Sequence, residues 1–264
     1  MELIKKLRAM TGAGMVDCQK ALKEAENDLD KAVEILRKKG IAKAAKRTDR
    51  DTSEGVVKLM VNEAGNEAYI LELNSETDFV ARNAQFQDFA GQVLAVIAAK
   101  RPAMLDELLA LPLNDMTVGD ALSNLSGTIG EKMTINRFAI LSGETVAAYS
   151  HLGGKIGVLV ALDKPNMTEI ATDVAMQIAA SNPKYLKPED VPVEEMDREK
   201  AIYREQLIKE GKPEVMVDKI VEGKMGKYYS EVCLIEQEFI KEDKKKVKEI
   251  LAGANILGYI RYSL

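Results

Sequence analysis

The first fifty residues carry the apolar pattern of three short helices. Apolar side chains recur every three or four positions over residues 3–10, 15–25 and 29–36, and residues 11–14 (Thr-Gly-Ala-Gly) interrupt the pattern. A period of three to four residues is typical of helices that bury one face. The spacing therefore predicts a compact unit of three helices.

The third of these helices has recognisable ends. Asn27 or Asp28 is suited to cap its amino end, and Gly40 stands where a C-cap glycine is expected. Residues 41–53 then lose the apolar periodicity and become rich in Ala, Lys, Arg and Asp, which is typical of a linker. We expect a domain boundary near residue 53, so that residues 1–53 form a helical domain and its linker.

A repeated pattern of strands and helices follows the linker. Strand-like apolar stretches flank Gly65-Asn66 and again flank Gly153-Gly154, which predicts two β-hairpins. Each hairpin leads to a helix whose apolar positions lie three or four residues apart. These positions are Phe86, Phe89, Val93 and Ile97 in the first copy, and Ile170, Val174 and Ile178 in the second.

Both copies of the pattern also end alike. In the first copy, residues 118–129 have a helical pattern and precede a strand at 134–141. In the second copy, residues 244–252 have a helical pattern and precede a strand at 256–262. This repetition along the chain indicates two structural units of one kind.

The repeat predicts an α+β fold with two related subdomains, residues 54–142 and 143–264, each an antiparallel sheet with helices against one face. Only the second subdomain carries an insertion, residues 188–230, with a stop signal at Gly211-Lys-Pro213. We expect a projecting helical hairpin of the coiled-coil type. Partner binding or dimerisation through this arm and the absence of any role are equally open. The apolar seam of the hairpin is expected to contain Val193, Met196, Leu207, Ile208, Val217, Ile220 and Val221.

Composition narrows the class of protein. The chain has 264 residues, 46% of them apolar, but no window approaches the roughly 18 apolar residues of a membrane span. Its amino terminus lacks the apolar stretch of a signal peptide. Cys18 and Cys233 are far apart in the sequence, so we expect buried thiols and no disulfide framework. These features predict a cytoplasmic protein without a membrane partner.

The net charge of −5 hides a basic amino-terminal region. Residues 1–50 contain 13 Lys and Arg against 8 Asp and Glu. A basic module suggests nucleic acid, but these lysines are spread over several helix faces and no aromatic residue accompanies them for base stacking. Solvated helix surfaces are therefore the favoured interpretation, and no nucleic-acid partner is predicted.

The inventory of catalytic groups is small. His151 is the single histidine, neither cysteine is near it in the sequence, and the glycine-rich phosphate-binding motifs are absent. The sequence therefore predicts no enzyme, no cofactor and no His or Cys metal site, although carboxylates alone could hold Mg²⁺ or Ca²⁺. An enzyme that uses carboxylates such as Glu76 and Asp78 is the weakest of the alternatives.

The connection between the first hairpin and its helix, residues 74–83, is longer than its counterpart in the second copy. Thr77 is suited to cap a short helical turn there, which would present Phe79 on a rigid projection. Alternatively, Phe79 packs against Phe86 and Phe89. The residues alone favour this packed arrangement, because an exposed phenylalanine is uncommon.

Several motifs, in order, resemble those of the elongation factor Ts family. They comprise residues 11–22 (TGAGMVDCQKAL), 76–83 (ETDFVARN) and 129–132 (IGEK), and His151 followed by residues 156–160 (IGVLV). The resemblance extends over almost the whole chain, including the paired subdomains and the inserted coiled coil. The first three helices are also similar to a ubiquitin-associated domain.

The resemblance implies a guanine-nucleotide exchange factor that binds elongation factor Tu and promotes release of its GDP. In such proteins, the loop that matches Thr77, Asp78, Phe79 and Val80 inserts into the GTPase and dislodges its Mg²⁺. We therefore expect these four residues to form the main contact with the GTPase. A ribosome-associated chaperone or targeting module, which would use the ubiquitin-associated-like domain, is the alternative.

The resemblance also implies further contacts with elongation factor Tu. Met15 and Val16 match positions of the amino-terminal domain, although the family often has a second Met where this chain has Val16. Ile129 and His151 match positions on the two subdomains that face the partner. For His151, a turn residue without a partner is the alternative.

Overall fold

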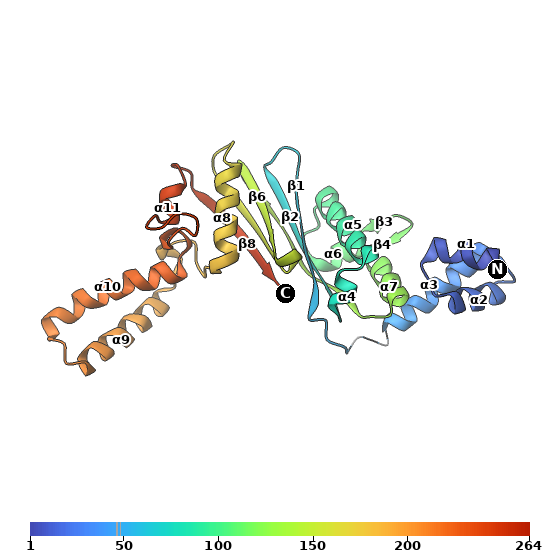
Figure 1. Ribbon diagram of the computed structural model, residues 1–264, viewed down its shortest axis with the longest axis horizontal. Helices are drawn as coiled ribbons and strands as arrows, with labels where there is room; N and C mark the ends of the chain where they lie inside the picture. Colours follow the sequence, from blue (N-terminus) through green and yellow to red (C-terminus); the bar gives the residue numbers. More distant parts are fainter. Residues whose placement is uncertain (46, 48) are drawn as a thin grey trace.

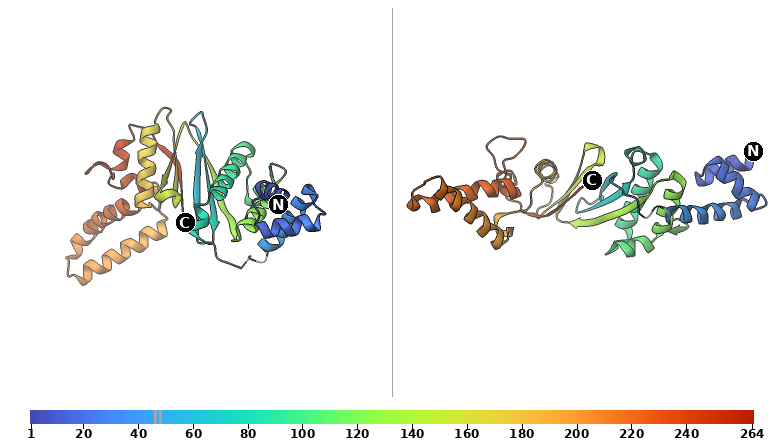
Figure 2. Two further views of the ribbon diagram at one scale, coloured as in Figure 1. Left: turned by 45° about the vertical axis from the view of Figure 1, so that its right-hand side comes forward. Right: turned by 90° about the horizontal axis from the view of Figure 1, so that it is seen from below.

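The computed structural model describes residues 1–45, 47 and 49–264. The molecule is elongated, and its carboxy terminus lies near the middle (Figure 1). A helical module lies at one end, two sheets lie in the middle, and a helical hairpin projects at the other end (Figure 2). None of the helices in the described residues combines the length and the apolarity that crossing a membrane requires.

The amino-terminal module consists of the three expected helices. Asp28 caps the third, because its Oδ1 accepts hydrogen bonds from the backbone N–H groups of Asp30 and Lys31, each at 3.0 Å. The apolar faces of the helices enclose one small core that includes Leu7, Cys18 and Leu22. The helices are α1 (Glu2–Thr11), α2 (Met15–Glu24) and α3 (Leu29–Ala45).

The prediction that Gly40 ends the third helix is wrong, because α3 continues to Ala45. Gly40 lies instead where α3 crosses α7 (Val118–Ile129). A Cβ atom added to Gly127 of α7 would lie 2.4 Å from the Cα atom of Gly40. Both glycines therefore allow a close approach of two helices. Part of the expected linker is helical as a result, while positions 46 and 48 lie outside the described residues.

The first sheet has the strand order β1-β2-β5 and is antiparallel throughout. Gly65 at the hairpin turn has a φ of 68°, which a glycine adopts without strain. The strands are β1 (Glu54–Val61), β2 (Glu67–Ser75) and β5 (Met133–Ser142). The helices α4 (Asp78–Ala81), α5 (Ala84–Lys100), α6 (Leu105–Ala110) and α7 and the short strands β3 (Pro112–Leu113) and β4 (Met116–Thr117) complete this subdomain.

The second sheet repeats the arrangement with the order β6-β7-β8. Its strands are β6 (Thr145–His151), β7 (Ile156–Leu162) and β8 (Ile256–Ser263). The other elements are η1 (Leu152–Gly154), α8 (Thr168–Ser181), η2 (Pro188–Asp190), α9 (Val193–Lys209), α10 (Glu214–Val232), η3 (Leu234–Glu236) and α11 (Val247–Ile250).

The two sheets pack face to face, with helices on their outer faces (Figure 1). Ile70, Val146 and Leu159 are buried between the sheets. A Cβ atom on Gly157 would lie 2.4 Å from a methyl carbon of Val57, so glycine is needed for this close contact. Separate cores fill the spaces between each sheet and its helices. The predicted α+β class is confirmed.

The helix expected over residues 244–252 is much shorter, since α11 spans only Val247–Ile250. Positive φ angles at Lys244 and Ala252 break the helix on both sides. Before α11 the chain turns over residues 240–244, and the extended Lys246 forms an isolated antiparallel bridge with Glu238. This local pairing overrides the helical pattern of the lysine-rich segment.

The insertion forms the expected helical hairpin, in which α9 and α10 lie on either side of Gly211. Leu207, Val217 and Val221 are buried along its seam. The predicted seam positions Val193 and Ile208 are wrong, because both side chains are mainly exposed. The reason for Ile208 is geometric: neighbouring helical residues point about 100° apart, and Leu207 occupies the seam.

Candidate functional site

A short helical projection follows the central strand of the first sheet. The backbone N–H of Val80 donates to Thr77 Oγ1 at 3.4 Å, so Thr77 is the N-cap of α4. Phe79, on the first turn of α4, is 82% exposed. We call residues Thr77–Ala81 the Phe79 knob; its helix lies at the edge of the first subdomain (Figure 1).

The base of the knob is held by apolar contacts. Val80 and Ala81 are buried in the core between the first sheet and its helices. The alternative in which Phe79 packs against Phe86 and Phe89 is wrong, because those two rings are buried in that core and Phe79 is not. With Val80 and Ala81 facing inward, the helical turn directs Phe79 outward.

Asp78 lies beside Phe79 at the amino end of α4. Its Oδ2 forms an ion pair with the guanidinium of Arg82, 2.9 Å away and one helical turn later. Both side chains are exposed, so this pair adds little to stability. It does place a carboxylate and a guanidinium next to the exposed ring.

Two carboxylates join the knob to the turn after α7. Glu131 accepts hydrogen bonds from the backbone N–H and the hydroxyl of Thr77, at 3.0 and 2.7 Å. Glu76 accepts one from the backbone N–H of Lys132, at 2.6 Å, and others from the guanidinium of Arg50. The backbone N–H of Lys132, followed by Arg50, lowers the pKa of Glu76 below its ordinary value.

Ile129 is the last residue of α7, immediately before Gly130 and Glu131. Its side chain is half buried against the core of the first subdomain. Only part of it is therefore available to a partner. Its position is nevertheless fixed, because Gly130 ends the helix with a φ of 97°.

His151 ends β6 and is exposed. Its Nδ1 lies 3.1 Å from the hydroxyl of Tyr149, and the two rings stack with centroids 5.8 Å apart. The adjacent Leu152 is 65% exposed and has a positive φ of 51°, which is rare for leucine. This turn therefore presents an aromatic pair and an apolar side chain together.

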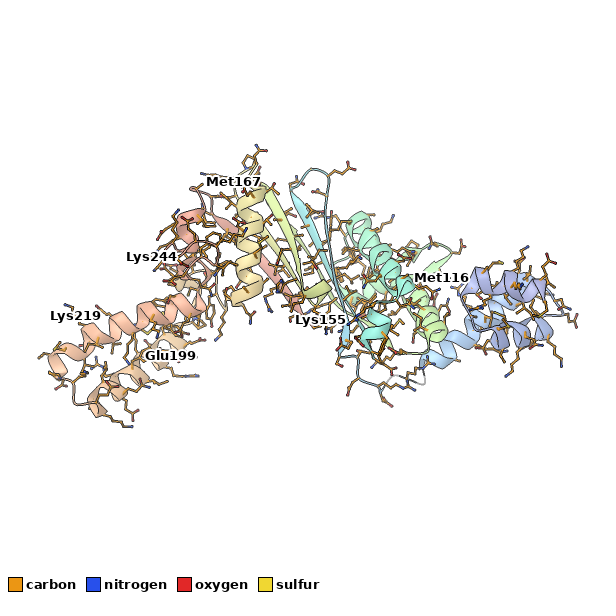
Figure 3. All side chains as sticks on the ribbon, in the orientation of Figure 1. Met116, Lys155, Met167, Glu199, Lys219 and Lys244 are labelled. Carbon is orange, nitrogen blue, oxygen red and sulfur yellow. The ribbon has the colours of Figure 1, made fainter. Side chains whose placement is uncertain are left out.

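The turn with His151 and the knob both contact β1, through η1 and through α4. Lys155, which follows η1 and is labelled in Figure 3, forms a 3.2 Å ion pair with Glu54, the first residue of β1. The structure therefore brings the knob and the His151 turn against the same strand.

Met15 and Val16 begin α2 and are both exposed. Cys18 and Leu22 on the opposite face are buried in the core of the module, which explains why the preceding two apolar residues face outward. The helical module that carries Met15 and Val16 lies at the end of the molecule opposite the helical hairpin (Figure 1).

The helical module docks against α7. Besides the contact between Gly40 and Gly127, Arg37 of α3 forms a 3.3 Å ion pair with Asp120 of α7. A cavity of about 220 Å³ remains between the module and α7, lined by Met10, Met116 and other residues of both parts (Met116 is labelled in Figure 3). The helix against which the module docks, α7, ends at the turn whose Glu131 holds Thr77 of the knob.

Phe79 and Leu152 project from a short helix and a turn. Among the described residues, no three His, Cys, Asp or Glu side chains lie close enough together to hold a metal ion. Both cysteines are buried, and burial raises the pKa of the Cys233 thiol to about 11. Separate exposed apolar groups on rigid supports are suited to contact a protein partner.

Sequence reasoning missed two features of this surface. Leu152 could have been noticed as a leucine directly before two glycines in a turn, a place where apolar residues are usually avoided. Glu131 and Lys132 were recognised only as part of a motif, because nothing in their spacing reveals that they contact residues 76 and 77, more than fifty positions away.

Part of the chain matches a known protein family. The family model described as elongation factor TS matches residues 76–264. The match begins just before the Phe79 knob, after β1 and β2, and continues through the last strand of the first sheet, the whole second sheet and the helical hairpin.

Proposed function

Because this chain belongs to the elongation factor Ts family, whose members are nucleotide exchange factors for elongation factor Tu, we propose that it promotes GDP release by inserting the Phe79 knob into Tu and dislodging Mg²⁺. The family acts in translation elongation and does not consist of enzymes in the usual sense. Action in the cytoplasm, without a nucleic-acid or membrane partner, is part of the proposal. Dimerisation through the helical hairpin stays a prediction.

The exposure of Phe79 on a buried base is the observation that carries this proposal. A side chain that inserts into a partner must be exposed before binding, and its backbone must keep its position when the partner presses against it. Phe79 is 82% exposed, whereas Val80 and Ala81 beneath it are buried. Burying a phenylalanine contributes about 2–3 kcal/mol. If the contact exists only in the opened GTPase, it favours that state by about thirty- to a hundredfold.

Loss of Mg²⁺ from the GTPase weakens its hold on the phosphates of GDP. Coupling between two binding sites is reciprocal, so a factor that weakens GDP and Mg²⁺ binding is itself weakened when they return. The cycle therefore needs no covalent chemistry and no catalytic base in this chain. Asp78, beside the ring, is placed to contact the same region of the GTPase.

The remaining exposed groups supply affinity in this proposal. Met15 and Val16 contact the GTPase from the helical module, while His151 contacts it from the second subdomain. Leu152 extends the apolar surface next to His151. Ile129, which is half buried, contributes a smaller contact at the end of α7. Contacts spread along the chain hold the partner while the knob acts at one place.

Phe79→Ala tests the wedge. We expect the maximal rate of GDP release from elongation factor Tu to fall by about thirty- to a hundredfold, because the apolar burial is lost. Stopped-flow measurement with fluorescent GDP gives this rate. The matched control is Ile240→Ala, which removes an exposed apolar side chain from the loop that follows η3. A folded Phe79→Ala protein with the wild-type rate would remove the wedge from the proposal.

Removing Mg²⁺ tests how the wedge works. If Phe79 acts by dislodging the cation, chelation of Mg²⁺ supplies the same effect by other means. The difference between wild type and Phe79→Ala should then shrink to about twofold or less in the presence of EDTA. An undiminished difference would show that the ring acts without the cation.

A further inference from the structure

The helix that carries Phe79 is too short to hold its own orientation. It spans four residues, Asp78–Ala81. A single helical turn fixes several backbone dihedrals for one or two hydrogen bonds and is unstable alone. Val80 and Ala81 anchor one side of the turn in the core, but they do not fix the residue at which the chain leaves β2 and enters the helix. That residue is Thr77.

Glu131 holds Thr77 from outside the helix. One carboxylate oxygen accepts the backbone N–H at 3.0 Å, and the other accepts the hydroxyl at 2.7 Å. A threonine hydroxyl has one proton, so donating it to Glu131 turns its lone pairs toward the backbone N–H of Val80, 3.4 Å away. The cap of the knob is therefore oriented by a charge-assisted pair of hydrogen bonds.

Glu131 is itself fixed in place. It follows Gly130, the C-cap of α7, and its backbone carbonyl accepts the Ser126 hydroxyl at 2.6 Å. Its position is thus set by the end of α7, the same helix against which the amino-terminal module packs. Glu131 links the knob to the element that also supports Met15 and Val16.

Comparison of the two subdomains shows which hydrogen bonds belong to the shared fold and which occur only beside the knob. After the central strand of each sheet comes a carboxylate that accepts the backbone N–H of the residue before the last strand. Glu76 accepts that of Lys132 at 2.6 Å, and Asp163 accepts that of Asn255 at 2.7 Å. The strand registers place these pairs at equivalent positions. This first clamp belongs to the shared fold.

The residue immediately before this N–H donor differs between the two copies. Glu131 precedes Lys132, whereas Ala254 precedes Asn255 and is buried. Ala254 has no carboxylate to hold the residue that follows Asp163. The second copy, whose corresponding connection carries no exposed phenylalanine, therefore forms its sheet and its turn with alanine at this position. The carboxylate at this position therefore occurs only in the subdomain that has the knob.

We propose that Glu131 is a positioning residue for nucleotide exchange, which holds Thr77 so that Phe79 projects in the orientation that opens the GTPase. This inference rests on the proposed function. Glu131 need not contact the partner, since it acts through Thr77.

The test compares Glu131→Ala with Glu131→Gln. Glu131→Ala reproduces the residue of the second copy and removes both hydrogen bonds. It should lower the maximal rate of GDP release by about tenfold, while the concentration of factor at half-saturation changes by less than about twofold. In Glu131→Gln the amide oxygen can still accept the Thr77 N–H while the amide NH2 donates to the Thr77 hydroxyl oxygen, so this variant should recover most of the rate. Glu144→Ala, which removes an exposed carboxylate from the turn before β6, is the control.

A double-mutant cycle separates positioning from general destabilisation. If Glu131 acts through the direction of Phe79, Glu131→Ala should lower the rate by less than about twofold further in a Phe79→Ala background. Independent, multiplied effects would overturn the proposal. So would an equal loss in Glu131→Ala and Glu131→Gln that follows a fall in their unfolding temperatures.

Hydrogen–deuterium exchange tests the clamp without the GTPase. The hydrogen-bonded backbone N–H groups of Thr77, Val80 and Ala81 should exchange at least about tenfold faster in Glu131→Ala than in wild type, with β2 unchanged. If wild-type protein fails to accelerate GDP release, the proposed function fails and this measurement still decides whether Glu131 positions the knob. Unchanged deuterium exchange at Val80 would overturn the positioning role, whatever the GDP-release assay shows.

Discussion

The two subdomains share one topology but use the connection after their central strand differently. In the first, residues 76–83 join β2 to α5 and raise Phe79 above the surface. In the second, residues 163–167 join β7 to α8, and Met167, the last of them, packs inward against the core (labelled in Figure 3). Three additional residues thus separate a structural turn from an exposed apolar projection.

The shorter connection is also closed on itself. The hydroxyl of Thr145 donates to the backbone carbonyl of Lys164 at 2.6 Å, and it accepts the backbone N–H of Met167 at 3.2 Å. The side chain of Thr145 therefore forms hydrogen bonds with a backbone carbonyl and a backbone N–H of the same turn. The first subdomain uses Glu131 and Thr77 for a related purpose but leaves a helical turn above them. An exposed helical turn has been added to a connection whose first carboxylate contact is common to both copies.

Exchanging the two connections would break this comparison most directly. Replacing residues 76–83 by the sequence of residues 163–167 removes the knob but keeps an acidic residue at the first position. We expect the rate of GDP release to fall by a hundredfold or more. Stability should fall by about 2–4 kcal/mol because the burial of Val80 and Ala81 is lost. Stopped-flow kinetics and chemical unfolding measure the two effects.

The contrast with Phe79→Ala makes the graft informative. Both variants remove the ring, but only the graft removes its support. Binding to elongation factor Tu through the other surfaces should persist in both and is measured by calorimetric titration. A grafted protein that folds and retains the wild-type rate of GDP release would show that the difference between the two connections has no functional meaning.

A second comparison concerns two glycines in helices. A Cβ on Gly127 would lie 2.4 Å from Gly40 Cα and 2.7 Å from its carbonyl oxygen, whereas nothing lies within 4 Å of a Cβ added to Gly226 in α10. Gly127→Ala should displace α3 from α7, at a cost of about 1–3 kcal/mol. Met15 and Val16 would then no longer match the partner, and affinity for elongation factor Tu should fall by about tenfold.

Gly226→Ala is the control for Gly127→Ala. It should stabilise the protein by about 0.5–1 kcal/mol, because alanine favours a helix, and leave affinity unchanged. Thermal unfolding and calorimetric titration test both variants. Wild-type affinity in Gly127→Ala would contradict a role for helix docking in placing the amino-terminal module.

The order of strands and helices could be predicted because each element carries its own period. The hairpins at Gly65 and Gly153 and the helices after them depend on local residues only. The stacking of the sheets was not predicted, although Val56 and Val57 are consecutive and buried on opposite faces of β1. Such adjacent apolar residues indicate a strand covered on both sides. The prediction for Gly40 was wrong because the sequence does not distinguish a glycine that ends a helix from one that allows another helix to pack closely.

The candidate site was accessible to sequence reasoning only in part. Thr77 as a cap followed from residue type, but the exposure of Phe79 did not, since hydrophobicity alone favours its burial. The direction of that ring depends on which face of the helical turn is buried, and here Val80 and Ala81 occupy the core. The hydrogen bonds from Thr77 to Glu131 depend on long-range pairing of β2 with β5. No local pattern encodes such a contact.

The helical hairpin, present in the second subdomain alone, provides the smallest expected effect. Glu195 at its base accepts hydrogen bonds from Lys184 Nζ at 2.7 Å and from the hydroxyls of Tyr185 and Tyr228 at 2.7 and 2.6 Å. These bonds, with that from Lys184 the strongest influence, lower the pKa of Glu195 to about 2 from an ordinary value of 4.5. The network therefore joins both arms of the hairpin to the body through one carboxylate.

Glu195→Gln should loosen the hairpin with less than a twofold effect on the rate of GDP release, because the knob is far from it (Figure 1). A carboxylate with a lowered pKa stabilises the folded state above its unfolded pKa, and that contribution is lost as the pH falls from about 4.5 toward 2. Wild type should thus have a higher unfolding temperature than Glu195→Gln at pH 6, and the difference should close as the pH approaches 2. A difference that is the same at both ends of this range, measured by thermal unfolding, would mean that the charge of Glu195 does not hold the arm.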